Sequence, residues 1–146
     1  MFKYFIKPVL QYTHVENISK ILQKEPGILF AYLFGSHAKN TMHKKSDIDI
    51  AVYLMDPILL EEDPLYPSRL AIKIEKALSE KKVVDLRILN GSTIRFKSQV
   101  IIHGKLIHSR DEKKRIEFET SSLTQYYDFK PYYEVYDTAR KARLGI

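Results

Sequence analysis

The sequence contains no cysteine, which excludes a disulfide framework and a thiolate metal site and is typical of the reducing cytoplasm. It also lacks any apolar run close to the ~20 residues that a membrane-spanning helix needs. Residues 1–12, MFKYFIKPVLQY, have no long unbroken apolar core and no small-residue cleavage site, so they do not resemble a signal peptide. We therefore expect a cytoplasmic protein that makes no contact with a membrane.

The length, 146 residues, and the apolar content, 45%, predict one globular domain with a real core. The net charge of +6 belongs to residues 1–110, which hold 17 Lys and Arg against 11 Asp and Glu, whereas residues 111–146 hold 7 of each. A basic body favours an anionic ligand such as a nucleotide or a nucleic acid. An excess of this size is equally typical of an ordinary soluble surface.

Short apolar runs alternate with segments of helical periodicity, and this pattern predicts an α+β fold, or α/β sandwich. Ser68 is the expected N-cap of the predicted helix 68–82, and either Ser92 or Thr93 is the expected N-cap of the predicted helix 92–104. Residues 56–67, with three prolines, are predicted to form a loop. The predicted strands are 28–34, 47–54, 83–89 and a short edge strand 105–109, and the predicted helices are 13–25, 68–82, 92–104, 111–126 and one after Pro131.

Two carboxylates, Asp47 and Asp49, lie one residue apart in the apolar run DIDIAVYL. Because side chains alternate along a strand, both point to the same side, about 6.6 Å apart. Two carboxylates at that separation repel each other, and burial raises the cost unless a cation compensates. A hard cation such as Mg²⁺ would relieve it. Alone, the pair is also consistent with Asp47 at a strand end and Asp49 facing water.

Two further features strengthen the metal hypothesis. Gly35-Ser36 directly follows a predicted buried strand, where glycine allows a close backbone approach and exposed N–H groups hold phosphate oxygens. Asp85 lies in another apolar strand, where an unpaired charge is expensive. Three carboxylates on neighbouring strands suit two metal ions, although Asp85 is equally consistent with an ion pair to Arg87 or a lysine.

The spacing Gly35-Ser36, ten residues, then Asp47-Ile48-Asp49 resembles the GS-x10-DxD signature of the DNA polymerase β-like nucleotidyltransferase superfamily. The flanking residues look like its minimal (MNT) branch. The resemblance implies a core with a short mixed sheet flanked by helices, followed by a C-terminal helical extension. It divides the chain into a nucleotidyltransferase domain, 1–110, and an extension, 111–146. Asn40 stands where many members have a second glycine, which affects the geometry of the loop.

The resemblance also implies roles for these residues. Gly35 and Ser36 would contact the triphosphate of the nucleotide. Asp47 and Asp49 would bind two Mg²⁺ ions. Asp85 would complete the catalytic metal site and help to deprotonate the acceptor hydroxyl. The reaction would move a nucleoside monophosphate from ATP, with pyrophosphate leaving, and would depend on positioning and charge neutralisation.

Polymerase-type relatives carry further domains that hold nucleic acid, and this chain is too short to contain them. We therefore expect an acceptor other than a nucleic acid. Minimal proteins of this size resemble the antitoxins paired with HEPN-domain RNase toxins, the MntA–HepT type, which adenylylate a tyrosine of the toxin. The extension holds five of the ten tyrosines, a composition that suits a partner surface or packing on the protein's own body. The chain has no R-x4-6-H motif of a HEPN RNase, so it would be the antitoxin.

Three hypotheses follow. The chain is an adenylyltransferase antitoxin that modifies a HEPN toxin, a nucleotidyltransferase that modifies a small-molecule hydroxyl, or an antitoxin that acts by occlusion without catalysis. We expect no direct contact with nucleic acid. A homodimer and a hetero-oligomer with the toxin are both consistent with the sequence.

Overall fold

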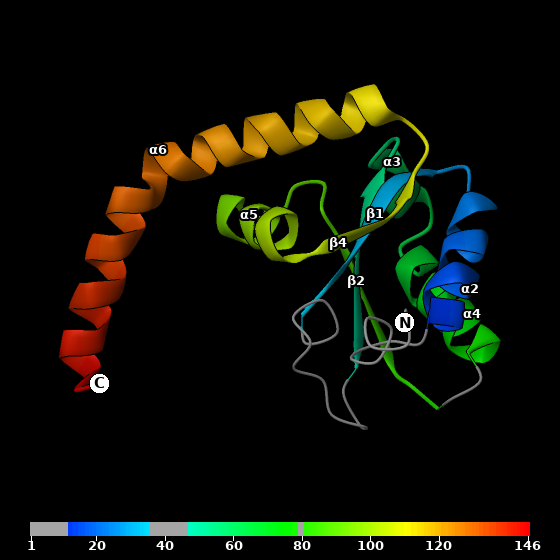
Figure 1. The fold of residues 1–146 in the computed structure, drawn as a ribbon, viewed down its shortest axis with the longest axis horizontal. Helices are drawn as coiled ribbons and strands as arrows, with labels where there is room; N and C mark the ends of the chain where they lie inside the picture. The colour runs from blue at the N-terminus through cyan, green and yellow to red at the C-terminus, as the bar shows by residue number, and fades with distance from the viewer. Residues whose placement is uncertain (1–11, 36–46, 79–80) are drawn as a thin grey trace, which may run out of the picture.

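A four-stranded mixed sheet lies at the centre of the computed structural model, which describes residues 12–35, 47–78 and 81–146 (Figure 1). The strand order is β3-β2-β1-β4, in which β1 runs antiparallel to β2 and β4, and β2 runs parallel to β3. The predicted short strand is at the edge of the sheet, as expected. The strands are β1 (Ile28–Phe34), β2 (Ile48–Leu54), β3 (Val84–Ile88) and β4 (Lys105–Ser109).

Helices cover both faces of the sheet, which gives the predicted α/β sandwich (Figure 1). One face packs on α2 and α4, and its core contains Ile18, Ile50 and Ile74. The other face packs on α5 and α6, and its core contains Phe30 and Val100. The helices are α2 (Tyr12–Gln23), α3 (Ile58–Glu62), α4 (Tyr66–Ala77), α5 (Ile94–His103) and α6 (Glu112–Leu144).

The start of α4 differs from the prediction. The helix begins at Tyr66 with Leu65 as its N-cap, so Ser68 lies inside the first turn and is not the cap. Pro67 explains the difference, because proline has no N–H to leave unpaired and its fixed φ suits the first turn of a helix. The predicted loop 56–67 also contains α3, whose N-cap is Pro57 and whose first N–H, that of Ile58, donates to Asp56 Oδ1 (3.0 Å). By contrast, Thr93 caps α5 as expected, accepting from the Phe96 N–H (3.1 Å).

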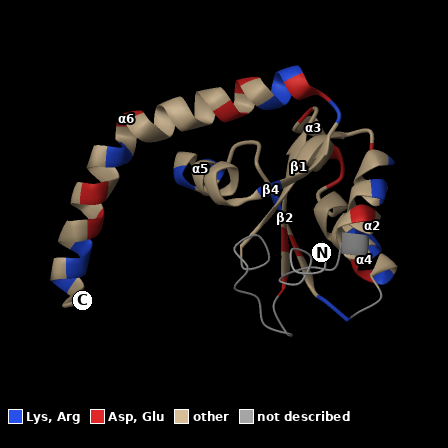
Figure 2. Cartoon of the chain, in the orientation of Figure 1, with Lys and Arg blue, Asp and Glu red and all other residues tan. Residues whose placement is uncertain are grey.

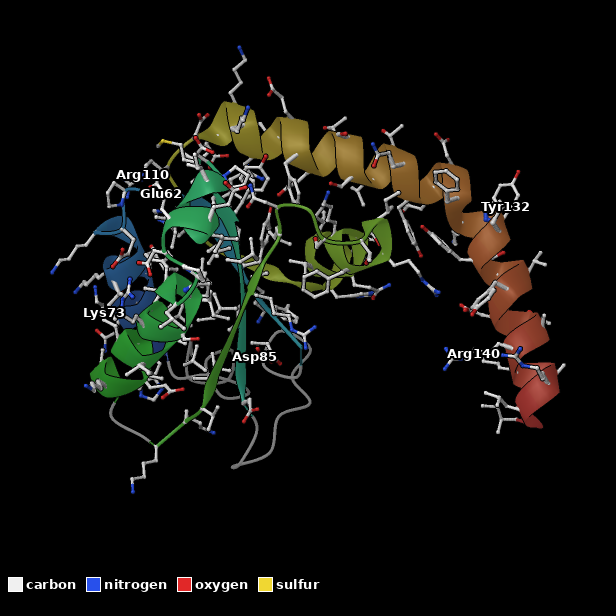
Figure 3. The ribbon with its side chains drawn as sticks, turned by 180° about the vertical axis from the view of Figure 1, so that it is seen from behind. Glu62, Lys73, Asp85, Arg110, Tyr132 and Arg140 are labelled. Atoms are coloured by element: carbon white, nitrogen blue, oxygen red, sulfur yellow. The ribbon has the colours of Figure 1, made fainter. Side chains whose placement is uncertain are left out.

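The C-terminal extension is one helix of 33 residues, not two helices separated at Pro131. Asp111 caps its start by accepting from the Lys114 N–H (3.0 Å), and Pro131 lies within it. A proline removes one backbone hydrogen bond and clashes with the preceding turn, which bends a helix without necessarily ending it. Figure 1 shows α6 turning a corner partway along, and Tyr132 lies at this bend in Figure 3. No helix of the described residues combines the length and apolar character that crossing a bilayer requires.

The first half of α6 is fixed to the sheet. Phe118 packs on Phe30 and Tyr53 with ring centroids 5.3 and 5.1 Å apart, and the Tyr32 hydroxyl donates to Glu119 Oε1 (2.6 Å). Beyond the bend, residues 131–146, which we call the arm, leave the body (Figure 1). The path of α6 therefore carries the arm along the α5 side of the sheet.

Acid is expected to destabilise the fold through His108, which is buried in β4. Burial and the nearby Arg110 charge hold the pKa of His108 below its usual range, although a hydrogen bond to the Ile28 backbone acts in the opposite direction. The folded protein then binds its proton less readily than the unfolded chain, so stability is lost as pH falls below about 6.5. Thermal melts should show a smaller decline from pH 7 to pH 5 in His108→Gln than in the wild type. The exposed His103→Gln is the control, and an unchanged decline in His108→Gln would contradict the argument.

Candidate active site

The first part of the site is the end of β1, where Gly35 adopts φ +72°. This left-handed conformation disfavours other residues. A Cβ atom built on Gly35 would collide with Asp49 Oδ2 and would lie 3.1 Å from Asp49 Cγ. Glycine is thus required twice at this position, by the backbone angle and by the Asp49 carboxylate. The predicted partner of Gly35, Ser36, lies outside the described residues.

The two strands that follow place two of the predicted carboxylates side by side. Asp49 lies opposite Phe34 on β1 and directly beside Asp85 on the parallel strand β3. Ile48 and Ile50 belong to the core on the α2 and α4 side, so by alternation Asp49 points to the α5 and α6 side. Both carboxylates are half-buried, and Figure 2 shows acidic residues at this end of the sheet. Residues 36 positions apart are therefore neighbours, as the sequence predicted.

Asp47 lies just before β2 and is exposed, but its charge still reaches Asp49. Partial burial raises the pKa of Asp49, and the negative charges of Asp85 and Asp47 raise it further, whereas the Arg87 charge lowers it. The three predicted carboxylates therefore form one electrostatically coupled group. Such a group is destabilised by its own charge and is relieved by a bound cation.

Arg87 is the positive group within this cluster. Its Nε atom lies 3.3 Å from Asp85 Oδ2, which is the ion pair that the sequence left open for Asp85. Its guanidinium carbon also lies 5.6 Å from the centre of the Phe96 ring, and Phe96 packs edge to face on Phe34 with centroids 5.5 Å apart. The i, i+2 spacing on a strand predicted that Arg87 and Asp85 share a face, but no local signal predicted the contribution of Phe96.

The chemistry of these side chains fits Mg²⁺, which prefers carboxylate oxygens and keeps water and phosphate oxygens in the rest of its shell. The missing side chain of Gly35 lets the Asp49 carboxylate lie directly against the backbone at the end of β1. Within the described ranges, no three His, Cys, Asp or Glu side chains already surround a common point as a metal-ligand set. The fit therefore rests on the donor types, their electrostatic coupling and the close approach of the Asp49 carboxylate to Gly35.

Comparisons with known proteins show the family and the fold of the chain. Residues 16–113 match the family described as Polymerase beta, Nucleotidyltransferase. The protein adenylyltransferase MntA of Shewanella oneidensis is 33% identical over 119 residues, covering 80% of each chain. A chain in a crystal structure of a toxin–antitoxin with AMP-PNP is 28% identical, with a TM-score of 0.69 over 86% of this chain and 98% of that one. A chain in a structure of a tri-AMPylated Shewanella oneidensis HEPN toxin in complex with MNT antitoxin is 26% identical, with a TM-score of 0.66 over 90% and 99%.

Proposed function

Because the chain belongs to the DNA polymerase β-like nucleotidyltransferase family, we propose that it is the antitoxin of a toxin–antitoxin pair and acts as a Mg²⁺-dependent protein adenylyltransferase. It transfers AMP from ATP to a tyrosine of a cognate HEPN-family RNase toxin in the cytoplasm and so neutralises that toxin. The observation that carries the proposal is the placement of Asp49 against Gly35 and beside Asp85 at one end of the sheet.

The residues of this end of the sheet have separate tasks. Gly35 and Ser36 hold the triphosphate of ATP, since a glycine at this point lets phosphate oxygens approach the backbone. Asp47, Asp49 and Asp85 would hold two Mg²⁺ ions, which would supply positive charge for the phosphate oxygens of the nucleotide. Mutual repulsion of the three carboxylates costs the folded protein free energy, and bound metal and substrate would offset that cost.

The transfer itself is an in-line displacement. The tyrosine hydroxyl oxygen forms a bond to the α-phosphorus of ATP, while the bond from that phosphorus to the oxygen bridging to the β-phosphorus breaks. Pyrophosphate leaves with that bridging oxygen. Asp85 accepts the hydroxyl proton, because it lies at the edge of the carboxylate group and is partly open to solvent. Arg87, which pairs with Asp85, keeps positive charge beside the reacting phosphates.

The extension, 111–146, supplies the surface that binds the toxin, while residues 1–110 carry the chemistry. Tyr132, Val135 and Tyr136 leave 71%, 71% and 60% of their surface exposed, which is unusual for large apolar side chains. Tyrosine suits a protein partner because it combines a large apolar area with a polar tip. Figure 3 shows Tyr132 directed away from the body. The other tail tyrosines include Tyr133, which instead packs toward α5.

The proposal predicts that α-³²P-ATP with Mg²⁺ will label the protein encoded beside this one. Both purified proteins are incubated together and separately, and a denaturing gel is exposed. Transfer of AMP is identified by label on the neighbour that is absent when EDTA is added. The label should also be absent when γ-³²P-ATP replaces α-³²P-ATP, because only the α-phosphate stays with the nucleoside. Label on neither protein would contradict a protein acceptor, and label on a small-molecule hydroxyl compound would favour the second hypothesis.

A further inference from the structure

The first turn of α5 contacts the arm. The Arg95 guanidinium donates two hydrogen bonds to the Asp137 carboxylate, from Nη1 to Oδ1 (3.2 Å) and from Nη2 to Oδ2 (2.7 Å). Its central carbon also lies 4.7 Å from the centre of the Tyr133 ring. A two-point hydrogen bond combined with stacking on a ring fixes orientation as well as distance. Arg95 therefore determines where the arm lies relative to α5.

The next residue of α5 contacts the candidate active site. Phe96 packs on Phe34, the residue immediately before Gly35, and supports the guanidinium of Arg87, which pairs with Asp85. Two consecutive residues of one short helix thus connect the arm with the end of the sheet that carries the carboxylates. Arg95 and Phe96 are adjacent in the first turn of α5, so one helix holds both the arm and the support of this end of the sheet.

The bend of α6 makes the contact between Arg95 and the arm important for the direction of the arm. Pro131 cannot donate a backbone hydrogen bond, so the angle between the two halves of α6 is held less firmly by the helix itself. Tyr133 and Asp137, which Arg95 holds, lie just beyond that bend. Among the residues that the structure describes, the pair of Arg95 and Asp137 joins the arm to an element other than α6, whereas Lys130 pairs with Glu134 within α6 itself.

We propose that Arg95 is a positioning residue, which sets the angle of the arm so that a protein bound to the arm presents its acceptor hydroxyl to the site at Asp49 and Asp85. The inference rests on the proposed function and adds to it the residue that determines which hydroxyl is reached. Arg95 touches neither ATP nor the acceptor in this role. Its loss therefore leaves ATP binding intact and weakens productive binding of the protein acceptor.

Kinetic measurements can separate an effect on ATP binding from an effect on the protein acceptor. In Arg95→Ala, kcat/KM for the HEPN protein should fall by about tenfold or more, because misplacement of an acceptor by about 1 Å costs up to 10²-fold in rate. The Kd for ATP with Mg²⁺ should stay within about twofold, since Phe96 still supports Arg87. Mass spectrometry should find AMP spread over more tyrosines, or over different ones, than in the wild type.

The decisive variant exchanges the two charges. Arg95→Asp combined with Asp137→Arg restores an ion pair in the same place, and it should recover most of the lost transfer, whereas each single change should not. Arg69→Ala is the matched control, because Arg69 makes a comparable two-point pair with Asp63, an exposed residue away from the arm. Circular dichroism and melting of each variant show that the fold is retained.

The outcomes are distinct. Equal kcat/KM values for the wild type and Arg95→Ala, or no recovery in the exchanged variant, would overturn the positioning role while leaving the proposed function in place. Loss of ATP binding in Arg95→Ala would also overturn it, since Arg95 would then act on the nucleotide site. If the wild type itself transfers no AMP to the HEPN protein, the proposed function fails first.

Discussion

Replacing Asp49 with asparagine is expected to abolish AMP transfer and, at neutral pH, to raise the melting temperature of the protein. Transfer should fall by about 10²–10³-fold or more, because the charge that holds the metal and balances the phosphates is lost. Stability should rise because burial and the charges of Asp85 and Asp47 raise the pKa of Asp49 in the folded state. An aspartate with a raised folded pKa costs stability once pH exceeds its unfolded value, and asparagine removes that cost.

The two effects are measured on the same samples. Label transfer to the HEPN protein gives the activity, and thermal melts at pH 7 give the stability, each with and without Mg²⁺ and ATP. The ligands should stabilise the wild type and not the variant. Asp56→Asn is the control, since Asp56 is exposed and an asparagine side-chain oxygen can accept the same bond from the Ile58 N–H. A variant that melts lower than the wild type, or one that retains transfer within about tenfold of it, would contradict the role of Asp49.

The same site separates catalysis from occlusion. The Asp47→Asn/Asp49→Asn double variant keeps the arm and its exposed aromatic side chains, so a purely occluding antitoxin would still neutralise the toxin. A catalytic antitoxin would not. Full protection of cells by a variant that transfers no nucleotide would therefore refute the catalytic hypothesis, even though the fold and the family membership would stand.

The sequence predicted that Asp49 and Asp85 lie on neighbouring strands, because a carboxylate in an apolar run is a local signal with a high free-energy cost of burial. Carboxylates inside apolar strands need a reason, and Asp49 and Asp85 lie side by side on β2 and β3 as that argument required. The strands were also predicted from a local signal, because a short apolar run flanked by turn residues is typical of a buried strand. What the sequence predicted of Ser36 concerns a residue outside the described ranges and stays a prediction.

The two wrong predictions, the end of a helix at Pro131 and the N-cap at Ser68, were both based on a single residue. In each case the neighbouring contacts or the geometry of the first helical turn outweighed that residue. Pro131 was expected to separate two helices, but α6 continues through it, and Arg95 holds Asp137 beyond the bend. Arg95 and Asp137 are 42 positions apart, so no local pattern connects them. Ser68 was expected to cap α4, but Pro67 is better suited to the first turn than to a loop before it.

Replacing Gly35 with alanine should disable the enzyme for two separable reasons. The first is backbone strain, because φ +72° costs a residue with a Cβ about 1–2 kcal/mol. The second is steric, because the new methyl group would occupy the position of the Asp49 carboxylate, and either that carboxylate or the turn must move. Displacing a metal-binding and phosphate-binding element by about 1 Å is expected to reduce transfer by about 10²-fold.

Gly91→Ala isolates the steric effect. Gly91 has φ +73°, and a Cβ atom built on it meets nothing within 4 Å, so this variant carries the backbone strain alone. Both variants should melt below the wild type, but only Gly35→Ala should lose AMP transfer and bind ATP with Mg²⁺ more weakly. Equal activity in the two variants would mean that the contact between Gly35 and Asp49 does not matter to the reaction. A loss of activity confined to Gly35→Ala would identify the space beside Asp49 as part of the working site, because the two substitutions differ in that space and not in their backbone angle.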